Sequence, residues 1–241
     1  MSTTGIGLFP TLLLSGAIAF AGWSVGKGVE AFRTADRSVT VKGLAEQDVK
    51  SDFAVWTLGF RRAGNEFGEV QRALTADREK VVAFLREQGF GDAEIEVRPL
   101  QVQDLLAREW GANNVALRFN GQGQVTVKSA RVDSVAEAAN KVDPLIQAGI
   151  QLAGDNEGMG GPRFQLRGFN DIKPKLLQEA TLSAREQAQK FAADAGATLG
   201  PLKNANQGVI RVLDDDGSDM DTSRTVGKRL RVVSTFEFAL R

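Results

Sequence analysis

The sequence predicts an α+β fold with largely antiparallel sheets and helices packed on one face, arranged as two subdomains and preceded by an N-terminal transmembrane helix. Three patterns support this prediction. Strand and helix patterns alternate along the 241 residues, several strand patterns follow one another as hairpin neighbours, and the first 26 residues carry no charged side chain. We therefore divide the chain into a signal-anchor or transmembrane segment, residues 1–28, and a module of two α+β subdomains, residues 29–241, with no boundary assigned between them.

The first segment has the length and polarity of a membrane span. As a helix rising 1.5 Å per residue, residues 5–25 would be about 31 Å long, close to the thickness of a bilayer core. Pro10 lies near its start, where a helix tolerates proline, and Trp23 lies at its far end, where it suits the interfacial belt. Cleavage near Ala21 is the alternative, because residues 19–21 form a small-x-small site, although no Lys or Arg precedes the apolar run.

The residues around the end of this run bear on orientation and association. Lys27, Arg33 and Arg37 follow the span and weakly favour a cytoplasmic location for that side. Gly22 and Gly26 form a GxxxG pair, a pattern that can mark the dimerisation of membrane helices but is common by chance.

The composition excludes several classes of chemistry. The chain has no Cys, His or Tyr, so it forms no disulfide, no Ser-His or Cys-His nucleophile and no zinc or copper site of the usual nitrogen and sulfur type. Thirty basic residues balance thirty acidic ones, which leaves no excess positive charge for a nucleic-acid backbone. We therefore expect no cofactor, no metal and no nucleic-acid partner, and we identify no catalytic residue. Carboxylates, or a Ser and Lys pair, are the chemistry that remains.

The first part of the module reads as strands around one long helix. The predicted strands are residues 38–43, 52–60, 94–106, 115–119 and 123–129, and the predicted helix is residues 65–88, ended by Gly89. Residues 52–60 are apolar on both faces, which is typical of a central strand covered on each side. Pro99 cannot donate to a ladder and predicts an edge or a bulge, while Asn120-Gly121 is a hairpin-turn signal.

The second part begins with a predicted helix over residues 132–149, capped by Asp133 or Ser134. A strand over residues 163–167 and a long helix over residues 170–196 follow. The last predicted strands are residues 208–213 and 230–240, and the latter alternates clearly between apolar and polar side chains.

The long helix is amphipathic and highly charged. Its predicted buried stripe consists of Leu177, Ala180, Ala184, Ala188, Phe191 and Ala195. We place Pro174 in the first turn and Gly196 at the left-handed stop, with Asn170 or Asp171 as the cap and Glu186 and Lys190 as an i,i+4 pair. Lys173, Glu179 and Arg185 could line a pocket, but a solvated helix face accounts for them without any function.

Two loops resemble ligand sites only superficially. Residues 213–223 hold five aspartates around Gly217, but a calcium loop aligned on that glycine would place Val212 at position one and Ser223 at position twelve, where acidic residues belong. Residues 154–161 are rich in glycine, yet they lack the Gly-Lys-Ser/Thr ending of a phosphate-binding loop. We interpret both as solvated loops.

Four segments resemble the SIMPL-domain family of bacterial envelope proteins. The segments are GLAEQDVKSDFAVW (residues 43–56), FNDIKPKLLQEATLSAREQAQKFAADAG (169–196), NQG (206–208) and KRLRVVSTFEFAL (228–240). The long helix segment is the specific one, with its IKP, EAT and AR-x-x-A-x-x-FA pattern. The resemblance implies an exported two-part α+β module in the periplasm or at the cell surface, self-assembly into oligomers, and a loose association with oxidative and envelope stress. It implies no catalytic residue.

Together these patterns favour a non-enzymatic, membrane-anchored envelope protein that oligomerises. We expect a single-pass protein of the cytoplasmic (inner) membrane with its C-terminal domain in the periplasm, or a soluble periplasmic protein if cleavage occurs near Ala21. Two other hypotheses stay open: a module that binds a peptide or envelope component by strand addition, and an enzyme that uses carboxylates or a Ser/Lys pair. A small-molecule ligand is unknown.

Overall fold

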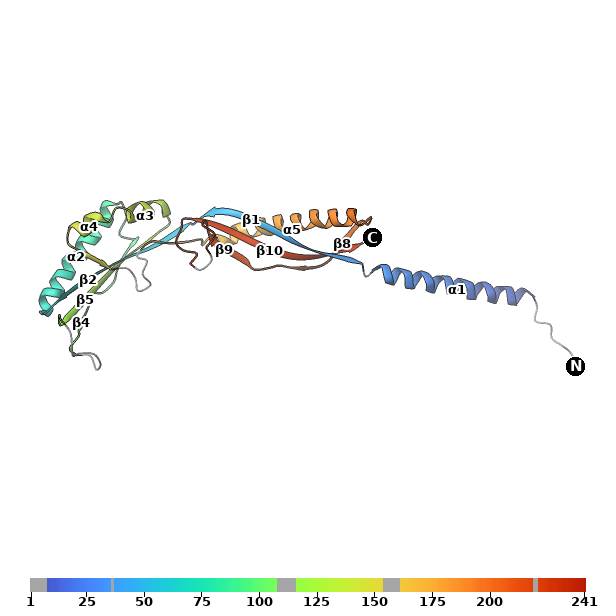
Figure 1. Ribbon diagram of the computed structural model, residues 1–241, viewed down its shortest axis with the longest axis horizontal. Coiled ribbons are helices and arrows are strands. Elements are labelled where there is room, and N and C mark those ends of the chain that lie inside the picture. The colour runs from blue at the N-terminus through green and yellow to red at the C-terminus, as the bar shows by residue number, and fades with distance from the viewer. Residues whose placement is uncertain (1–7, 36, 108–115, 154–160, 219–220) are drawn as a thin grey trace. The chain divides into compact units, whose positions relative to one another are not determined.

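The computed structural model describes residues 8–35, 37–107, 116–153, 161–218 and 221–241, with side chains from residue 13 onward and none over 30–35 (Figure 1). The chain divides into two compact units. Unit 1 comprises Met1–Ala45, Lys175–Ile210 and Val232–Arg241, and unit 2 comprises Glu46–Pro174 and Arg211–Arg231. Each unit is therefore built from segments that lie far apart in the sequence.

The chain begins with helix α1, Leu8–Ala35, which includes most of the predicted apolar span. Its large apolar side chains from Leu13 to Val29 are exposed, each by more than half. Over the described stretches, no helix meets the combined length and hydropathy that a membrane crossing requires. The predicted transmembrane helix therefore stays a prediction.

Unit 1 is a sheet covered by one helix. Its sheet runs in the order β1-β10-β8, with β9 also paired to β10. The strands are β1 (Ser38–Lys50), β8 (Leu199–Asn206), β9 (Ile210–Asp214) and β10 (Gly227–Leu240), some of which continue into unit 2. The alternation predicted for residues 230–240 is confirmed, because side chains from Leu230 to Phe238 are buried at every second position of β10.

Helix α5, Phe169–Asp194, packs on β1 and β10 through small residues. Ala184 and Ala188 contact Val41, Phe236 and Phe238. A Cβ atom on Gly43 would lie 1.9 Å from the backbone oxygen of Ala180, so a side chain at that position of β1 would collide with the helix.

Three details of α5 differ from the sequence-based expectation. The buried stripe is Leu176, Ala180, Ala184, Ala188 and Ala192, so the prediction was wrong at Leu177, Phe191 and Ala195. The stripe keeps a four-residue step from Leu176 to Ala192, so Phe191 lies off it and is 58% exposed. The helix begins at Phe169, so Pro174 lies in its second turn rather than its first. Asn170 and Asp171, the expected caps, lie inside the helix, so that expectation was wrong. At the other end, Gly196 has a φ of +66°, as the predicted left-handed stop requires.

Unit 2 is a six-stranded antiparallel sheet with helices packed against one core. The sheet runs in the order β3-β5-β2-β6, with β4 on β5 and β7 on β2. The strands are β2 (Phe53–Gly64), β3 (Ile95–Val97), β4 (Gln101–Asp104), β5 (Phe119–Ser129), β6 (Gln151–Ala153) and β7 (Arg163–Gln165). β2 is the predicted central strand; Trp56, Leu58 and Phe60 are buried on one face and the other face is half-buried.

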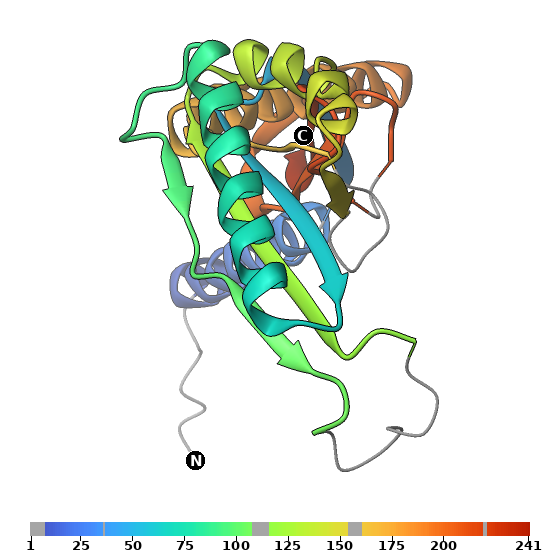
Figure 2. The same ribbon diagram turned by 90° about the vertical axis from the view of Figure 1, so that its left-hand side faces the viewer.

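The helices of unit 2 share this core. They are α2 (Phe67–Glu87), α3 (Val132–Ala139) and α4 (Asp143–Gln147). Figure 2 shows α2 lying along β2 and β5, and its residues Leu74, Val81 and Leu85 are fully buried there. Gly89, with a φ of +87°, follows the helix as predicted. The α+β class with antiparallel sheets is therefore confirmed.

The hairpin predicted at Asn120-Gly121 was wrong. Both residues lie inside β5, which pairs with β2 without a break from Phe119 to Ser129. A Cβ on Gly121 would lie 2.4 Å from Leu74 Cδ1, and one on Gly123 would lie 2.4 Å from the Phe60 ring. The two glycines therefore make room for the core rather than for a turn. Residue 115, where the predicted hairpin began, lies outside the described residues.

The helix predicted over residues 132–149 is two helices. They are separated at residues 140–142, because Pro144 has no N–H and could not donate to the carbonyl of Asn140 in a continuous helix. The expected caps were also wrong. Arg131 occupies the N-cap of α3 without a side-chain hydrogen bond, and Asp133 pairs instead with Lys50, at 2.5 Å.

Candidate functional site

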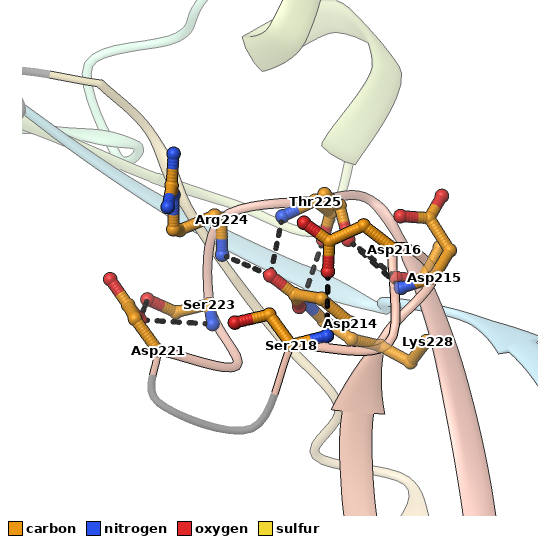
Figure 3. Close-up of polar contacts among 10 residues, drawn as sticks. Asp214, Asp215, Asp216, Ser218, Asp221, Ser223, Arg224, Thr225 and Lys228 are labelled. Atoms are coloured by element: carbon orange, nitrogen blue, oxygen red, sulfur yellow. Dashed lines mark hydrogen bonds and ion pairs between the residues drawn. The ribbon is translucent and has the colours of Figure 1, made fainter.

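The most enclosed group of charged atoms in the described structure is an ion pair in unit 2 between Asp214 and Lys228 (Figure 3). Asp214 ends β9 and Lys228 is the second residue of β10, so the pair closes the loop between these strands. The two side chains are 0% and 1% exposed. The sequence places one of these residues in an acidic loop and the other in a basic run, and both therefore look solvated.

Every charged atom of this pair has a partner close by. Lys228 Nζ donates to Asp214 Oδ1 and, at 2.6 Å, to the carbonyl oxygen of Thr225. Asp214 Oδ2 accepts the backbone N–H groups of Arg224 at 3.1 Å and Thr225 at 3.3 Å. Thr225 Oγ1 donates to the carbonyl of Gly227 at 2.8 Å. Since burying a charge without such partners is costly, this arrangement ties the end of β9 to residues 224–228.

The aspartates that follow Asp214 bond mainly to their own loop. Asp216 Oδ1 accepts the N–H of Ser218 at 2.8 Å, and Asp221 Oδ1 accepts both the N–H and the hydroxyl of Ser223. The hydroxyl of Ser223 lowers the pKa of Asp221 below its ordinary value. Within the described part of the chain, no three acidic side chains are grouped to hold a metal ion. Asp219, one of the five aspartates of residues 213–223, lies outside that part.

A second nearly buried ion pair joins β2 to α2. Asp77 has a side chain only 2% exposed, and Arg62 Nε donates to its Oδ2 at 2.5 Å while Nη2 donates to its Oδ1 at 2.8 Å. The same Nη2 donates to the carbonyl of Gly149 at 2.8 Å. The hydrogen bond to Asp77 raises the pKa of Arg62. A bidentate pair of this kind fixes the helix on the sheet.

A third cluster surrounds Glu94, just before β3. Its carboxylate accepts Ser129 Oγ at 2.5 Å, Arg131 Nη2 at 2.6 Å and the N–H of Gly91 at 3.0 Å. Burial raises the pKa of Glu94, but the hydrogen bonds from Arg131, Ser129 and Gly91 together outweigh it and lower that pKa to about 2. The carboxylate is therefore ionised at neutral pH and tied to its neighbours, which does not suit a proton-transferring acid or base.

Over the described residues, two of the surface hollows on unit 2 are shallow. One, of about 140 Å³, is lined by Arg98, Pro99, Gln101, Gln122, Gly123 and Gln124. The other, of about 100 Å³, is lined by apolar residues around Trp56 and Leu152. Both are smaller than pockets that enclose small molecules, which usually measure about 300–1,000 Å³. Neither brings two carboxylates, or a serine and a lysine, together.

The residues of α5 that could have lined a pocket lie on an open face. Arg185 is exposed, and Glu179 pairs with Lys175 at 4.0 Å, one helical turn away. The glycine-rich loop over residues 154–160 lies outside the described residues. No local sequence pattern indicates the three ion-pair clusters, because their members are 14, 15 and 37 residues apart.

A comparison with protein families matches residues 39–229 to the family described as SIMPL, protein of unknown function (DUF541). The match covers 191 of the 241 residues, from β1 through the first residues of β10. A comparison with curated proteins found no match. The family match includes the segments at residues 43–56 and 169–196 on which the resemblance was based. The chain therefore belongs to the SIMPL family.

Proposed function

We propose that this protein is a non-enzymatic, membrane-anchored envelope protein that assembles with copies of itself. The observation that carries the proposal is helix α1, whose apolar side chains have no protein to cover them in the described structure. Within the apolar run, Leu13, Leu14, Ile18, Phe20, Trp23 and Val25 are each 58–67% exposed.

The distribution of these side chains supports a lipid environment. At 100° per residue, Leu14 and Trp23 point to opposite sides of the helix, and Phe20 points about 120° away from Leu14. A helix that docks in a protein groove usually keeps a polar face, whereas one surrounded by lipid is apolar on all sides. Residues 1–26 carry no charge, so the apolar stretch of the sequence is long enough to reach across a bilayer core.

We further propose a single-pass location in the cytoplasmic membrane with the C-terminal domain in the periplasm. The support is the resemblance of residues 43–240 to exported proteins, since the charges after the span give little guidance. Cleavage near Ala21 would instead release a soluble periplasmic protein. The proposed association with oxidative and envelope stress is likewise supported by the family resemblance alone.

The absence of enzymatic activity is part of the proposal. The chain has no His or Cys, and the enclosed acids Asp77, Glu94 and Asp214 are each held by a cation. Neutralised carboxylates of this kind stabilise a fold and are poor general acids or bases.

A binding module that captures a peptide strand is the second candidate, and one observation favours it. Strand β1 lies at an edge of its sheet and is 13 residues long. Such an edge presents unpaired backbone groups to any extended chain, so a peptide is an alternative to a second copy.

The anchor is tested by membrane extraction of the full-length protein. We expect it to stay with membranes through high salt and alkaline carbonate and to leave them only in detergent. Ile18→Arg places a charge in the middle of the apolar run, at a cost of about 2.5–3.5 kcal/mol for insertion, and we expect it to release a large fraction of the protein.

Val29→Arg is the matched control, because it places the same charge beyond Lys27, where the span has ended. We expect this variant to remain in the membrane fraction. A wild-type protein extracted by carbonate alone, or an Ile18→Arg variant that stays as firmly bound as Val29→Arg, would contradict the anchor.

A further inference from the structure

Strand β1 presents the longest unpaired edge among the described strands. It pairs with β10 on one side and forms an outer edge of the sheet. The opposite edge strand, β8, contains Pro201 and has two register shifts against β10. In unit 2, the outer strands β3, β4, β6 and β7 have only three or four residues each. Short or irregular edges resist strand addition, so β1 is the edge best suited to it.

The register of β1 on β10 shows which backbone groups face outward. The N–H of Leu240 donates to the carbonyl of Arg37, and Arg231 and Arg229 of β10 pair with Glu46 and Asp48 of β1. From one of these three contacts to the next, the residue number on β10 falls by as much as the residue number on β1 rises. The two strands are therefore antiparallel and keep a single register. Since Arg37 points its carbonyl at β10, the odd-numbered residues of β1 do the same.

The even-numbered residues of β1 therefore present their N–H and C=O groups to the open edge. Their side chains also share one face, which is exposed, whereas Val41 and Ala45 on the other face are buried. Any strand added at this edge would bond to the even-numbered backbone groups and would set its own side chains beside Lys42, Leu44 and Glu46.

This edge is complementary to itself. If a second β1 runs antiparallel with its centre at Leu44, Leu44 faces Leu44, Lys42 faces Glu46 in both directions, and Thr40 faces Asp48. All even-numbered backbone groups find partners, and all 13 residues overlap. Leu44 is 42% exposed in the single chain and would be covered by its counterpart.

Other registers that use the same backbone groups fit less well. Centring the pair on Lys42 or on Glu46 sets like charges against each other. Centring it on Gly43 or Ala45 sets Leu44 against Lys42 or Glu46. The register centred on Leu44 is the one that joins the two leucines and also pairs opposite charges.

The charges of β10 extend this complementarity. Arg231 Nε lies 3.3 Å from Glu46 Oε1, so in a pair of chains Glu46 would lie between Arg231 of its own sheet and Lys42 of the second copy. A lysine at a sheet edge usually discourages pairing, but here an acidic residue faces it in the second strand.

We propose that two copies of this chain pair antiparallel through the open edges of β1, with Leu44 on the two-fold axis and Lys42 opposite Glu46. This proposal rests on the self-assembly proposed above and identifies the edge of β1 as the surface through which the copies assemble. The result is one sheet that continues from one subunit into the next.

Charge reversal tests the register. In the full-length protein in mild detergent, Lys42→Glu sets a new glutamate against Glu46 of the second copy, and Glu46→Lys sets a new lysine against Lys42. We expect each variant to associate at least about tenfold more weakly than the wild type, because facing like charges oppose binding. In a mixture of the two variants every facing pair is of opposite charge, so we expect mixed dimers at close to wild-type affinity. Recovery in the mixture also shows that both variants are folded.

Disulfide cross-linking tests the position of the two-fold axis. The chain has no native cysteine, so any disulfide must form between the introduced cysteines. Leu44→Cys would place two Cα atoms about 5.5 Å apart, within disulfide range, so we expect rapid oxidation to a dimer. Thr40→Cys is the control, because two copies of residue 40 would be eight residues, about 27 Å, apart along the strands. We expect it to stay monomeric on denaturing gels, but to cross-link when mixed with Asp48→Cys.

The outcomes separate this proposal from the general one. If the wild type is a monomer by light scattering, self-assembly is wrong and the β1 interface with it. If the wild type is a multimer, but the mixture of charge variants recovers nothing and Leu44→Cys cross-links no faster than Thr40→Cys, then assembly uses another surface and the β1 proposal alone is wrong.

Discussion

Replacing Lys228 by Met tests whether the buried Asp214–Lys228 pair is a structural element of unit 2. The methionine fills a similar volume but removes both hydrogen bonds of Nζ. Asp214, with a side chain 0% exposed, would then have only the N–H groups of Arg224 and Thr225 as donors. Removing one partner of a buried pair typically costs about 3–5 kcal/mol, and we expect a loss in this range.

The free energy of unfolding is measured in urea through tryptophan fluorescence, to which Trp56, 2% exposed in the core of the same unit, contributes. The double variant Lys228→Met/Asp214→Asn removes the unpaired charge while keeping an acceptor for the two N–H groups. We expect it to regain roughly half of the loss, because a neutral amide costs less to bury than a carboxylate.

Lys50→Met is the matched control, since Lys50 pairs with Asp133 at the surface, where both side chains are more than half exposed. We expect it to change the free energy of unfolding by less than about 1 kcal/mol. The reasoning is refuted if Lys228→Met costs no more than Lys50→Met, or if the double variant is less stable than the single one.

Two further predictions concern pH and packing. Glu94→Gln should cost about 2–3 kcal/mol at pH 7. The folded-state pKa of Glu94 is lowered from 4.5 to about 2, so its contribution is full above about pH 4.5 and is lost as the pH falls through 2. The free energies of unfolding of the wild type and Glu94→Gln are compared in urea at pH 7 and near pH 2, with Glu96→Gln, at a surface residue, as the control. If Glu94→Gln is still less stable than the wild type at pH 2, the prediction is wrong. Gly43→Ala should destabilise unit 1 by roughly 1–3 kcal/mol or more, because the methyl group meets the backbone of α5, whereas Gly68→Ala, where a Cβ meets only ordinary contact, should not. The two variants are compared by thermal unfolding. An unchanged midpoint for Gly43→Ala would show that α5 does not lie as close to β1 as the structure places it.

The parts of the fold that follow from local pattern were predictable. The alternation of β10 and the central position of β2 depend on the side chains of single strands. Strand β8 was missed because residues 199–206 include Pro201 and are mostly exposed, so the segment is a strand only through its pairing with β10. Asn120-Gly121 was wrongly predicted to be a hairpin turn. The sequence does not distinguish a glycine that leaves room for the side chains of α2 from a glycine that forms a turn.

The ion-pair clusters could not be predicted for a related reason. Asp214 stands among three consecutive aspartates, and only the folded loop shows that the first is buried and the others are exposed. Likewise, the stripe of α5 was placed on Phe191 because hydrophobicity suggested it. The close approach of the helix to Gly43 selects small residues instead, and that approach is a property of the packed unit.

The most direct test of the proposed function is the intact mass and the native size of the full-length protein taken from membranes in mild detergent. The account predicts a subunit of 25.9 kDa that retains its first 21 residues and elutes as a defined multimer by size-exclusion chromatography with light scattering. A subunit that begins near Gly22 and elutes as a soluble monomer would contradict both the anchor and the assembly.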